Sequence, residues 1–424
     1  MFTQITRLST IAICVVISTS SALTAASGPD NSTETRKPYA KVSDSDSGKV
    51  QLNMCERVFT PVDGNGPRIR LVSAIHIADA SFYKNMQNRL DSYDTVLFEG
   101  VKPAGLDPID PELNDQGKAD ATQERIALLL EIIEHYHAAT HQLPSSFDDL
   151  LESDDTRIAA MVRSTMQDGW GEEFTIELIH LDLNDEQSKQ VDITSTGNDR
   201  KIGGQGLATD IKLSSRSYTE NEKRKPTPEG IQSQLANALR VSFQLDEMDT
   251  TKSNWINADI DINELQKQLA EQGEDNAQIL KLLEGDSFQA KIIGFALKFV
   301  SRSPTMSSMM KLAMMDMLAL IESTDMLAQF DAVNNVILHG RNDIVIEYLK
   351  AELANNKSTE DIAIFYGAAH MPGLEDVITS ELGYQYDSDI WTPAMTVDIE
   401  DTGLSKTQIK MMRNMIKSSL EQQF

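Results

Sequence analysis

The sequence is poor in cysteine, in basic residues and in long apolar runs, and each shortage argues against a class of protein. Its two cysteines, Cys14 and Cys55, are too few for a disulfide-stapled scaffold. Lysine and arginine number 38 against 65 acidic residues, a net charge of −27. We expect neither nucleic acid nor an anionic membrane surface as a partner, because both need clustered positive charge. After the first 26 residues no run of about 20 is uniformly apolar, so no stable membrane span is expected.

The N-terminus carries the features of an export signal. Met1–Ala26 combines an early Arg7, an apolar core over Ile11–Ile17 and small residues before its end, which is typical of a secretory signal peptide. Residues 27–49 are rich in Ser, Asp, Thr and Lys and are predicted to form a flexible leader. We therefore expect an exported protein, periplasmic or extracellular.

A strand–helix–strand pattern opens the folded part of the chain. Two short apolar runs, Ile69–Ala74 and Thr95–Phe98, flank a segment with helical spacing of its apolar residues. His76 and Glu99 stand just after the two runs. Because ligands collect at the C-terminal ends of parallel strands, both side chains are predicted on the functional edge of a sheet.

The same pattern recurs late in the chain. An apolar run ends at Gly367, two alanines and His370 follow, and Pro372 suits the first turn of a helix. Taken alone, His76 or His370 could equally cap a helix or fill a gap. Their recurrence in the same setting favours a paired site, and two imidazoles with a carboxylate are a plausible ligand set for a divalent metal.

Several of these motifs resemble the TraB/PrgY/GumN/TIKI family, over about Val50–Val101 and Lys225–Ile399. The matching segments read SAIH, FEG, QLDEMD, NWINADID, HGRND and GAAHMPG. The family hallmarks are paired G-x-x-H motifs, a glutamate after the second strand and an Arg-Asn pair. The positions that fill them are His76, Glu99, Arg341, Asn342, Gly367 and His370, while Ser73 stands where the first motif has glycine.

The resemblance implies an α/β fold, a sheet with helices on its faces, and a hydrolase that depends on a divalent metal (Mn, Co or Zn). His76, His370 and Glu99 would be the ligands, with Glu99 alternatively a general base. Arg341 and Asn342 would be catalytic, Arg341 by stabilising an oxyanion. The substrate would be an unidentified peptide or small molecule.

The middle of the chain has a different character and resembles the C-terminal globular domain of the type II secretion major pseudopilin. The matching pieces are the turn Asp168-Gly169-Trp170-Gly171 and the spaced run Ser195-x-Gly197-x-Asp199, Gly203-Gly204-x-Gly206 and Asp210-Ile211. In that family the last loop binds calcium, which implies Asp199 and Asp210 as calcium ligands here. The alternative is a turn-rich loop held by its own hydrogen bonds.

These patterns predict a domain plan. Residues 50–117 and 219–400 form one α/β domain, an α+β pseudopilin-like domain is inserted at residues 118–218, and residues 401–424 form a C-terminal amphipathic helix. The first functional hypothesis is an exported metal-dependent hydrolase, a peptidase, whose insertion recognises a secretion-system or surface partner. The alternatives are a non-catalytic binding or scaffold protein, and a protein that binds a small ligand or haem without turnover.

Overall fold

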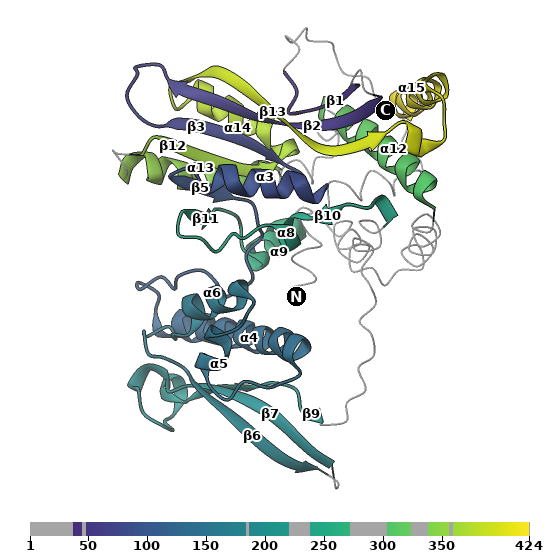
Figure 1. Ribbon diagram of the computed structural model, residues 1–424. Helices are drawn as coiled ribbons and strands as arrows, with labels where there is room; N and C mark the ends of the chain where they lie inside the picture. Colours follow the sequence, from purple (N-terminus) through teal and green to yellow (C-terminus); the bar gives the residue numbers. More distant parts are fainter. Residues whose placement is uncertain are drawn as a thin grey trace. The chain divides into compact units, whose positions relative to one another are not determined.

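The computed structural model describes residues 37–44, 48–183, 186–219, 238–271, 303–323, 338–355 and 359–423. They divide into two compact units (Figure 1): a smaller one built from residues 102–228 with 261–263, and a larger one built from the chain on either side. Both contain helices and sheets, so the predicted α/β class is confirmed. The predicted signal peptide lies outside the described residues.

The larger unit is organised around one sheet to which seven of the described strands belong, in the order β1-β2-β3-β12-β5-β11 with β13 alongside β2. β3, β12, β5 and β11 are parallel to one another, whereas β1, β2 and β13 pair antiparallel. The strand bounds are β1 Ala40–Asp44, β2 Lys49–Pro61, β3 Arg68–Ala74, β5 Thr95–Phe98, β11 Trp255–Asn257, β12 Asp361–Gly367 and β13 Tyr384–Asp398.

The two strands of the opening strand–helix–strand pattern do not pair with each other. β12 lies between β3 and β5 and pairs with both. Its residues 362–366 are all buried, and the continuous apolar run that they form is typical of a central parallel strand covered on both faces. The late motif therefore sits in the middle of the sheet.

Helices cover both faces of this sheet. On one face lie α3 (Ala80–Leu90), α12 (Pro304–Ser323) and α15 (Lys406–Gln423), which bury Phe82, Met315 and Ile409 in one apolar core. On the other lie α13 (Gly340–Asn355) and α14 (Met371–Ser380), which bury Leu349 and Leu374 in a second core. Each fully buried side chain of this size contributes about 1.5–3 kcal/mol, so the sheet is held from both sides. α15 matches the predicted C-terminal helix.

The end of the predicted flexible leader is part of the sheet. β1 pairs with β2, and the residue before it, Tyr39, is buried. Tyr39 donates its hydroxyl to Glu375 Oε2 at 2.8 Å, and Arg57 lies 4.2 Å from its ring centroid. The leader prediction thus fails over Tyr39–Asp44, because one aromatic anchor outweighs a polar composition. β13 is the longest strand of the sheet, and its first half is largely exposed.

A small second sheet joins two distant segments of the larger unit. β4 (Ile77–Ala78) pairs antiparallel with β10 (Ser242–Phe243), which runs directly into the short helix α8 (Gln244–Glu247). Helix α9 (Ile262–Glu271) follows β11. The β4–β10 pair brings residue 244 beside residue 76.

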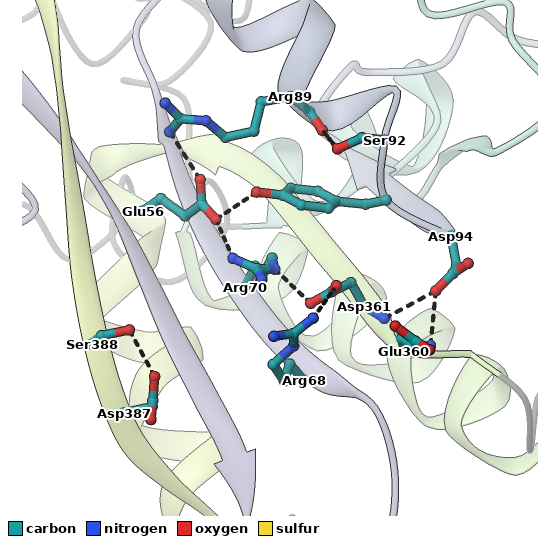
Figure 2. Close-up of polar contacts among 11 residues, drawn as sticks. Glu56, Arg68, Arg70, Arg89, Ser92, Asp94, Glu360, Asp361, Asp387 and Ser388 are labelled. Carbon is teal, nitrogen blue, oxygen red and sulfur yellow. Dashed lines mark hydrogen bonds and ion pairs between the residues drawn. The ribbon is translucent and has the colours of Figure 1, made fainter.

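A charged network lies on the α3 face of the sheet, towards the N-terminal ends of β3 and β12 (Figure 2). Glu56, whose side chain is 1% exposed, accepts hydrogen bonds from Arg70, Arg89 and Tyr93 at 2.7–3.0 Å. Arg70 also binds Asp361 at 2.6 Å, and the second oxygen of Asp361 receives Arg68 at 2.7 Å. Asp94 accepts the backbone N–H groups of residues 360 and 361.

The smaller unit packs helices against an antiparallel sheet in the order β6-β7-β8, with β9 on β7. Arg125 is buried on helix α4 (Asp115–Thr140) and donates to the backbone oxygens of Gln167 and Asp107. These bonds attach the segment around Asp107, which precedes α4, to the rest of the smaller unit. None of the helices in the described part of the whole chain is long and apolar enough to cross a membrane. The element bounds are α4 Asp115–Thr140, α5 Phe147–Leu151, α6 Thr156–Thr165, β6 Thr175–Leu183, β7 Glu186–Ser195, η1 Gly197–Asp199, η2 Gly206–Ala208, β8 Ile211–Ser214 and β9 Tyr218–Thr219.

Candidate functional site

The four parallel strands of the larger unit end at one edge, and each is followed by a polar residue. His76 comes two residues after β3, Glu99 directly after β5, His370 three after β12 and Asp259 two after β11. The strand register aligns these ends, because β12 pairs with β3 and β5 up to its last residues and β11 with β5 likewise. The first turn of α13 adds Arg341 and Asn342, which are both buried.

Arg341 joins two of the strand ends. Its Nη2 donates to Glu99 Oε1 at 2.7 Å and to Asp259 Oδ2 at 2.6 Å, and its Nε donates to Asp259 Oδ1 at 2.8 Å. The guanidinium is 3% exposed, so two of its nitrogens are committed to carboxylates inside the protein. This geometry lets Arg341 hold Glu99, and it leaves Nε and Nη2 no access to the oxyanion that Arg341 was predicted to stabilise.

Glu99 is held as a carboxylate despite its burial. Burial alone would raise its pKa, but the charge of Arg341, with the two histidines and a hydrogen bond from the backbone N–H of Gly367, lowers that pKa to about 2. The Gly367 N–H donates to Glu99 Oε2 at 2.6 Å. A carboxylate of such low pKa is a poor general base at neutral pH and a good cation ligand.

Asn342 determines which nitrogen of His370 carries the hydrogen. Its Nδ2 donates to the backbone oxygen of His370 at 3.2 Å, which turns its Oδ1 towards His370 Nδ1 at 2.8 Å. His370 Nδ1 is therefore the protonated nitrogen, and Nε2 keeps a lone pair. Burial lowers the pKa of His370 to about 4, so the ring is neutral at physiological pH.

His76 is the most accessible of the predicted ligands and is only partly buried. Burial lowers its pKa; the charges of Glu99 and Arg341 act on it in opposite directions, and the Gln244 side chain raises it. His76 follows β3, whose end is aligned with that of β12, and β12 in turn pairs with β5. The structure therefore brings all five residues predicted for this site to one edge of the sheet: His76, Glu99, Arg341, Asn342 and His370.

The donor set suits a cation. Nε2 of His370 lies 3.7 Å from Glu99 Oε1, so a lone pair and a carboxylate oxygen face each other. A divalent ion between them would satisfy both. Among the residues that the structure describes, no group of three or more His, Cys, Asp and Glu side chains forms a complete metal site. Glu99 and His370 lie close to each other, and the metal site predicted from His76, Glu99 and His370 stays a prediction.

Two residues of this edge were not predicted as site residues. Asp259 resembled a helix N-cap by its position, yet it receives Arg341 and the N–H of Gly100. The N-capping hydrogen bond comes from Asp261, which accepts the N–H of Asn263 at 2.8 Å. Gln244 lies in the QLDEMD segment, and only the β4–β10 pairing reveals that it lies beside His76.

The predicted calcium ligands lie in the glycine-rich loop of the smaller unit. Asp210 accepts the N–H of Gly203 with both oxygens at 3.0 Å, and Asp199 accepts the N–H of Lys201 at 3.0 Å. Gly204 has a φ of +102°, and a Cβ there would lie 2.0 Å from the oxygen of Ala208, so only glycine fits. The loop is thus tightly folded on its own backbone, and calcium binding stays a prediction.

Comparison with known families bears on the smaller unit. Residues 112–214 match the family model described as "Type II secretion system (T2SS), protein G", a range that runs from just before α4 to the end of β8. The match supports the predicted pseudopilin-like domain. No curated protein and no solved structure matches the chain. The resemblance of the larger unit to the TraB/PrgY/GumN/TIKI family stays a prediction.

Proposed function

We propose that the larger unit is an exported, metal-dependent hydrolase of the peptidase type, and that the pseudopilin-like unit recognises a secretion-system or surface partner. The observation that carries the hydrolase proposal is the facing pair of His370 Nε2 and Glu99 Oε1, 3.7 Å apart. Glu99 Oε1 also receives Arg341 and His370 Nδ1 is bonded to Asn342, so the two groups are held in place with Nε2 of His370 close to a carboxylate oxygen. The secretion-system part rests on the family match over residues 112–214, which also favours a periplasmic or extracellular location.

The side chains divide the work between holding a metal and keeping its ligands ready. Glu99 and His370 would bind the ion, and His76, the accessible one, would complete the set and face the substrate. Arg341 keeps Glu99 ionised, Asp259 keeps Arg341 in place, and Asn342 keeps the hydrogen of His370 on Nδ1. When bound, Mn²⁺, Co²⁺ or Zn²⁺ supplies the Lewis acidity that activates water and polarises a carbonyl.

The experiment is a search for hydrolysis with the purified protein after removal of residues 1–26. A mixture of peptides is incubated with the protein and Mn²⁺, Co²⁺ or Zn²⁺, and products are identified by mass spectrometry. We expect cleavage that a chelator abolishes and the metal restores. His370→Ala should lose it, while His180→Ala, a change at an exposed histidine of the smaller unit, should keep it. Absence of metal-dependent cleavage of any peptide would contradict the proposal.

A second candidate is a non-catalytic scaffold associated with a secretion system. It is favoured by the family match, which concerns a secretion-system component and lies entirely in the smaller unit. Its distinguishing measurement is binding of the full chain to purified pseudopilins of the same organism by biolayer interferometry. Binding that survives His370→Ala, together with absent hydrolysis, would favour the scaffold over the enzyme.

A further inference from the structure

We infer that Gln244 is a positioning residue for His76: its side-chain oxygen accepts the ring N–H of His76 and leaves the other ring nitrogen as a lone pair for the site. The inference rests on the proposed function in so far as His76 is a metal ligand. It adds a residue that fixes the tautomer of one histidine, so that the other ring nitrogen offers the lone pair that a metal ligand needs.

The backbone holds Gln244 against His76. Phe243 pairs with Ile77 across the β4–β10 ladder, and the N–H of Gln244 donates to the backbone oxygen of His76 at 2.9 Å. Gln244 also begins helix α8, so its Cα is fixed by a strand on one side and a helical turn on the other. The side chain therefore leaves the backbone next to the imidazole that it is inferred to control.

The side-chain oxygen of Gln244 has unused capacity. Gln244 is 5% exposed, and in the described part of the chain its Oε1 is buried and has no hydrogen-bond partner. An unpaired buried amide oxygen is destabilising, so a partner is expected for it. The His76 imidazole is the adjacent candidate, because Gln244 is already bonded to the backbone of His76.

The other histidine of the site has the same kind of partner. Asn342 gives a hydrogen bond to the backbone oxygen of His370 and receives one from its ring Nδ1 at 2.8 Å. Gln244 also gives a hydrogen bond to the backbone oxygen of its histidine, although from its main-chain N–H, and its buried side-chain oxygen has no hydrogen-bond partner. In metal sites such partners fix the tautomer of the ligand, and their loss typically costs 10–100-fold in affinity.

The test compares Gln244→Leu, which removes the acceptor, with Gln244→Glu, which keeps it. Gln87→Leu is the matched control for a structural glutamine, because the Gln87 amide bonds to Asp91 and to both backbone groups of Asp249. Co²⁺ affinity is measured by calorimetry on the full mature chain. We expect Gln244→Leu to weaken Co²⁺ binding 10–100-fold, with Gln244→Glu and Gln87→Leu retaining it. Equal affinity of Gln244→Leu and the parent protein would overturn the inference.

A second measurement needs no metal and separates this inference from the proposed function. In the metal-free protein at about pH 8, where imidazoles are neutral, ring ¹⁵N spectra report the His76 tautomer, assigned with His76→Ala. We expect one tautomer in the parent protein and in Gln244→Glu, and a redistribution in Gln244→Leu at an undiminished Tm. An unchanged tautomer in Gln244→Leu overturns the inference even if metal binds. A redistribution supports it even if the parent protein binds no Co²⁺.

Discussion

The same sheet carries two clusters of charged and polar side chains, one on the α3 face towards the N-terminal ends of the parallel strands and one at their C-terminal ends. In the first, Glu56, Arg70 and Asp361 are fully paired with one another and with their neighbours (Figure 2). In the second, Arg341 is also paired, but His370 Nε2 faces a carboxylate oxygen with no hydrogen between them. We interpret the fully paired first cluster (the closed network) as stabilising the fold, and the close approach of His370 Nε2 to Glu99 Oε1 in the second (the open cluster) as a candidate ligand set.

The largest expected effect tests the closed network. Glu56→Ala should lower the free energy of unfolding by about 3–5 kcal/mol, because it leaves Arg70 buried without one of its two partners. Urea unfolding followed by circular dichroism measures it. Metal affinity of the folded protein should be unchanged. A variant as stable as the parent would contradict a stabilising role of the first cluster. A folded variant that loses metal binding would contradict the separation of the two clusters by function.

A pH series tests the open cluster without metal. His370 titrates near 6.5 when unfolded and at about 4 when folded, so the unfolded chain binds more protons between these values. The free energy of unfolding should therefore fall as pH drops through this window, by roughly 1–3 kcal/mol. Glu99, with a folded pKa of about 2, adds a loss of the same sign below about pH 4.5.

The control for the pH series is His370→Gln, which should flatten the decline between about pH 6.5 and 4. Glu56→Gln should leave that part of the profile as it is in the parent protein, because the closed cluster contains no histidine. The free energy of unfolding is measured in urea at each pH with chelator present. A parent profile that is flat over this window would show that His370 is not held neutral by burial.

The smaller unit offers an intermediate case. The carboxylates of Asp199 and Asp210 already accept backbone N–H groups but keep further lone pairs. Calcium should raise the Tm of this unit by about 2–8 °C, if binding contributes about 1 kcal/mol. Asp199→Ala with Asp210→Ala should remove the response, as measured by differential scanning calorimetry. Identical melting temperatures with calcium and with chelator would mean that the loop binds no calcium and is held by its own hydrogen bonds.

The smallest change in stability is expected for Arg68, the exposed residue of the charged network around Glu56. Arg68, whose side chain is 46% exposed, binds Asp361 from the solvent side. Arg68→Ala should change the free energy of unfolding by at most about 1 kcal/mol, because exposed ion pairs contribute little. The same urea unfolding assay measures it against Glu56→Ala. A loss comparable to that of Glu56→Ala would mean that burial does not decide which pairs matter.

Local patterns predicted much of the fold and of the site. The run Thr95–Phe98 is strand β5, and the placing of His76, Glu99 and His370 after strands follows from a pattern that each segment carries in itself. Strand order was not predictable in this way. The position of β12 between β3 and β5 depends on which apolar faces pack together across hundreds of residues.

The residues that were not predicted make contacts with partners far away in the sequence, which local patterns do not indicate. Asp259 stands near a helix start, where an aspartate is ordinarily a cap, and its bond to Arg341 joins residues 82 positions apart. Tyr39 lies in a polar segment, and its partner Glu375 is 336 positions away. Gln244 has no local signature, since only the β4–β10 pairing sets it beside His76.

The central claim is that His76, Glu99 and His370 hold one divalent ion at the C-terminal ends of the strands. It is tested most directly by the metal stoichiometry of the purified mature protein after equilibrium dialysis against Mn²⁺, Co²⁺ or Zn²⁺, measured by inductively coupled plasma mass spectrometry. The account predicts one tightly bound ion per chain, lost in His76→Ala and in His370→Ala and kept in His180→Ala. A parent protein without bound metal, or equal metal content in all four proteins, would contradict it.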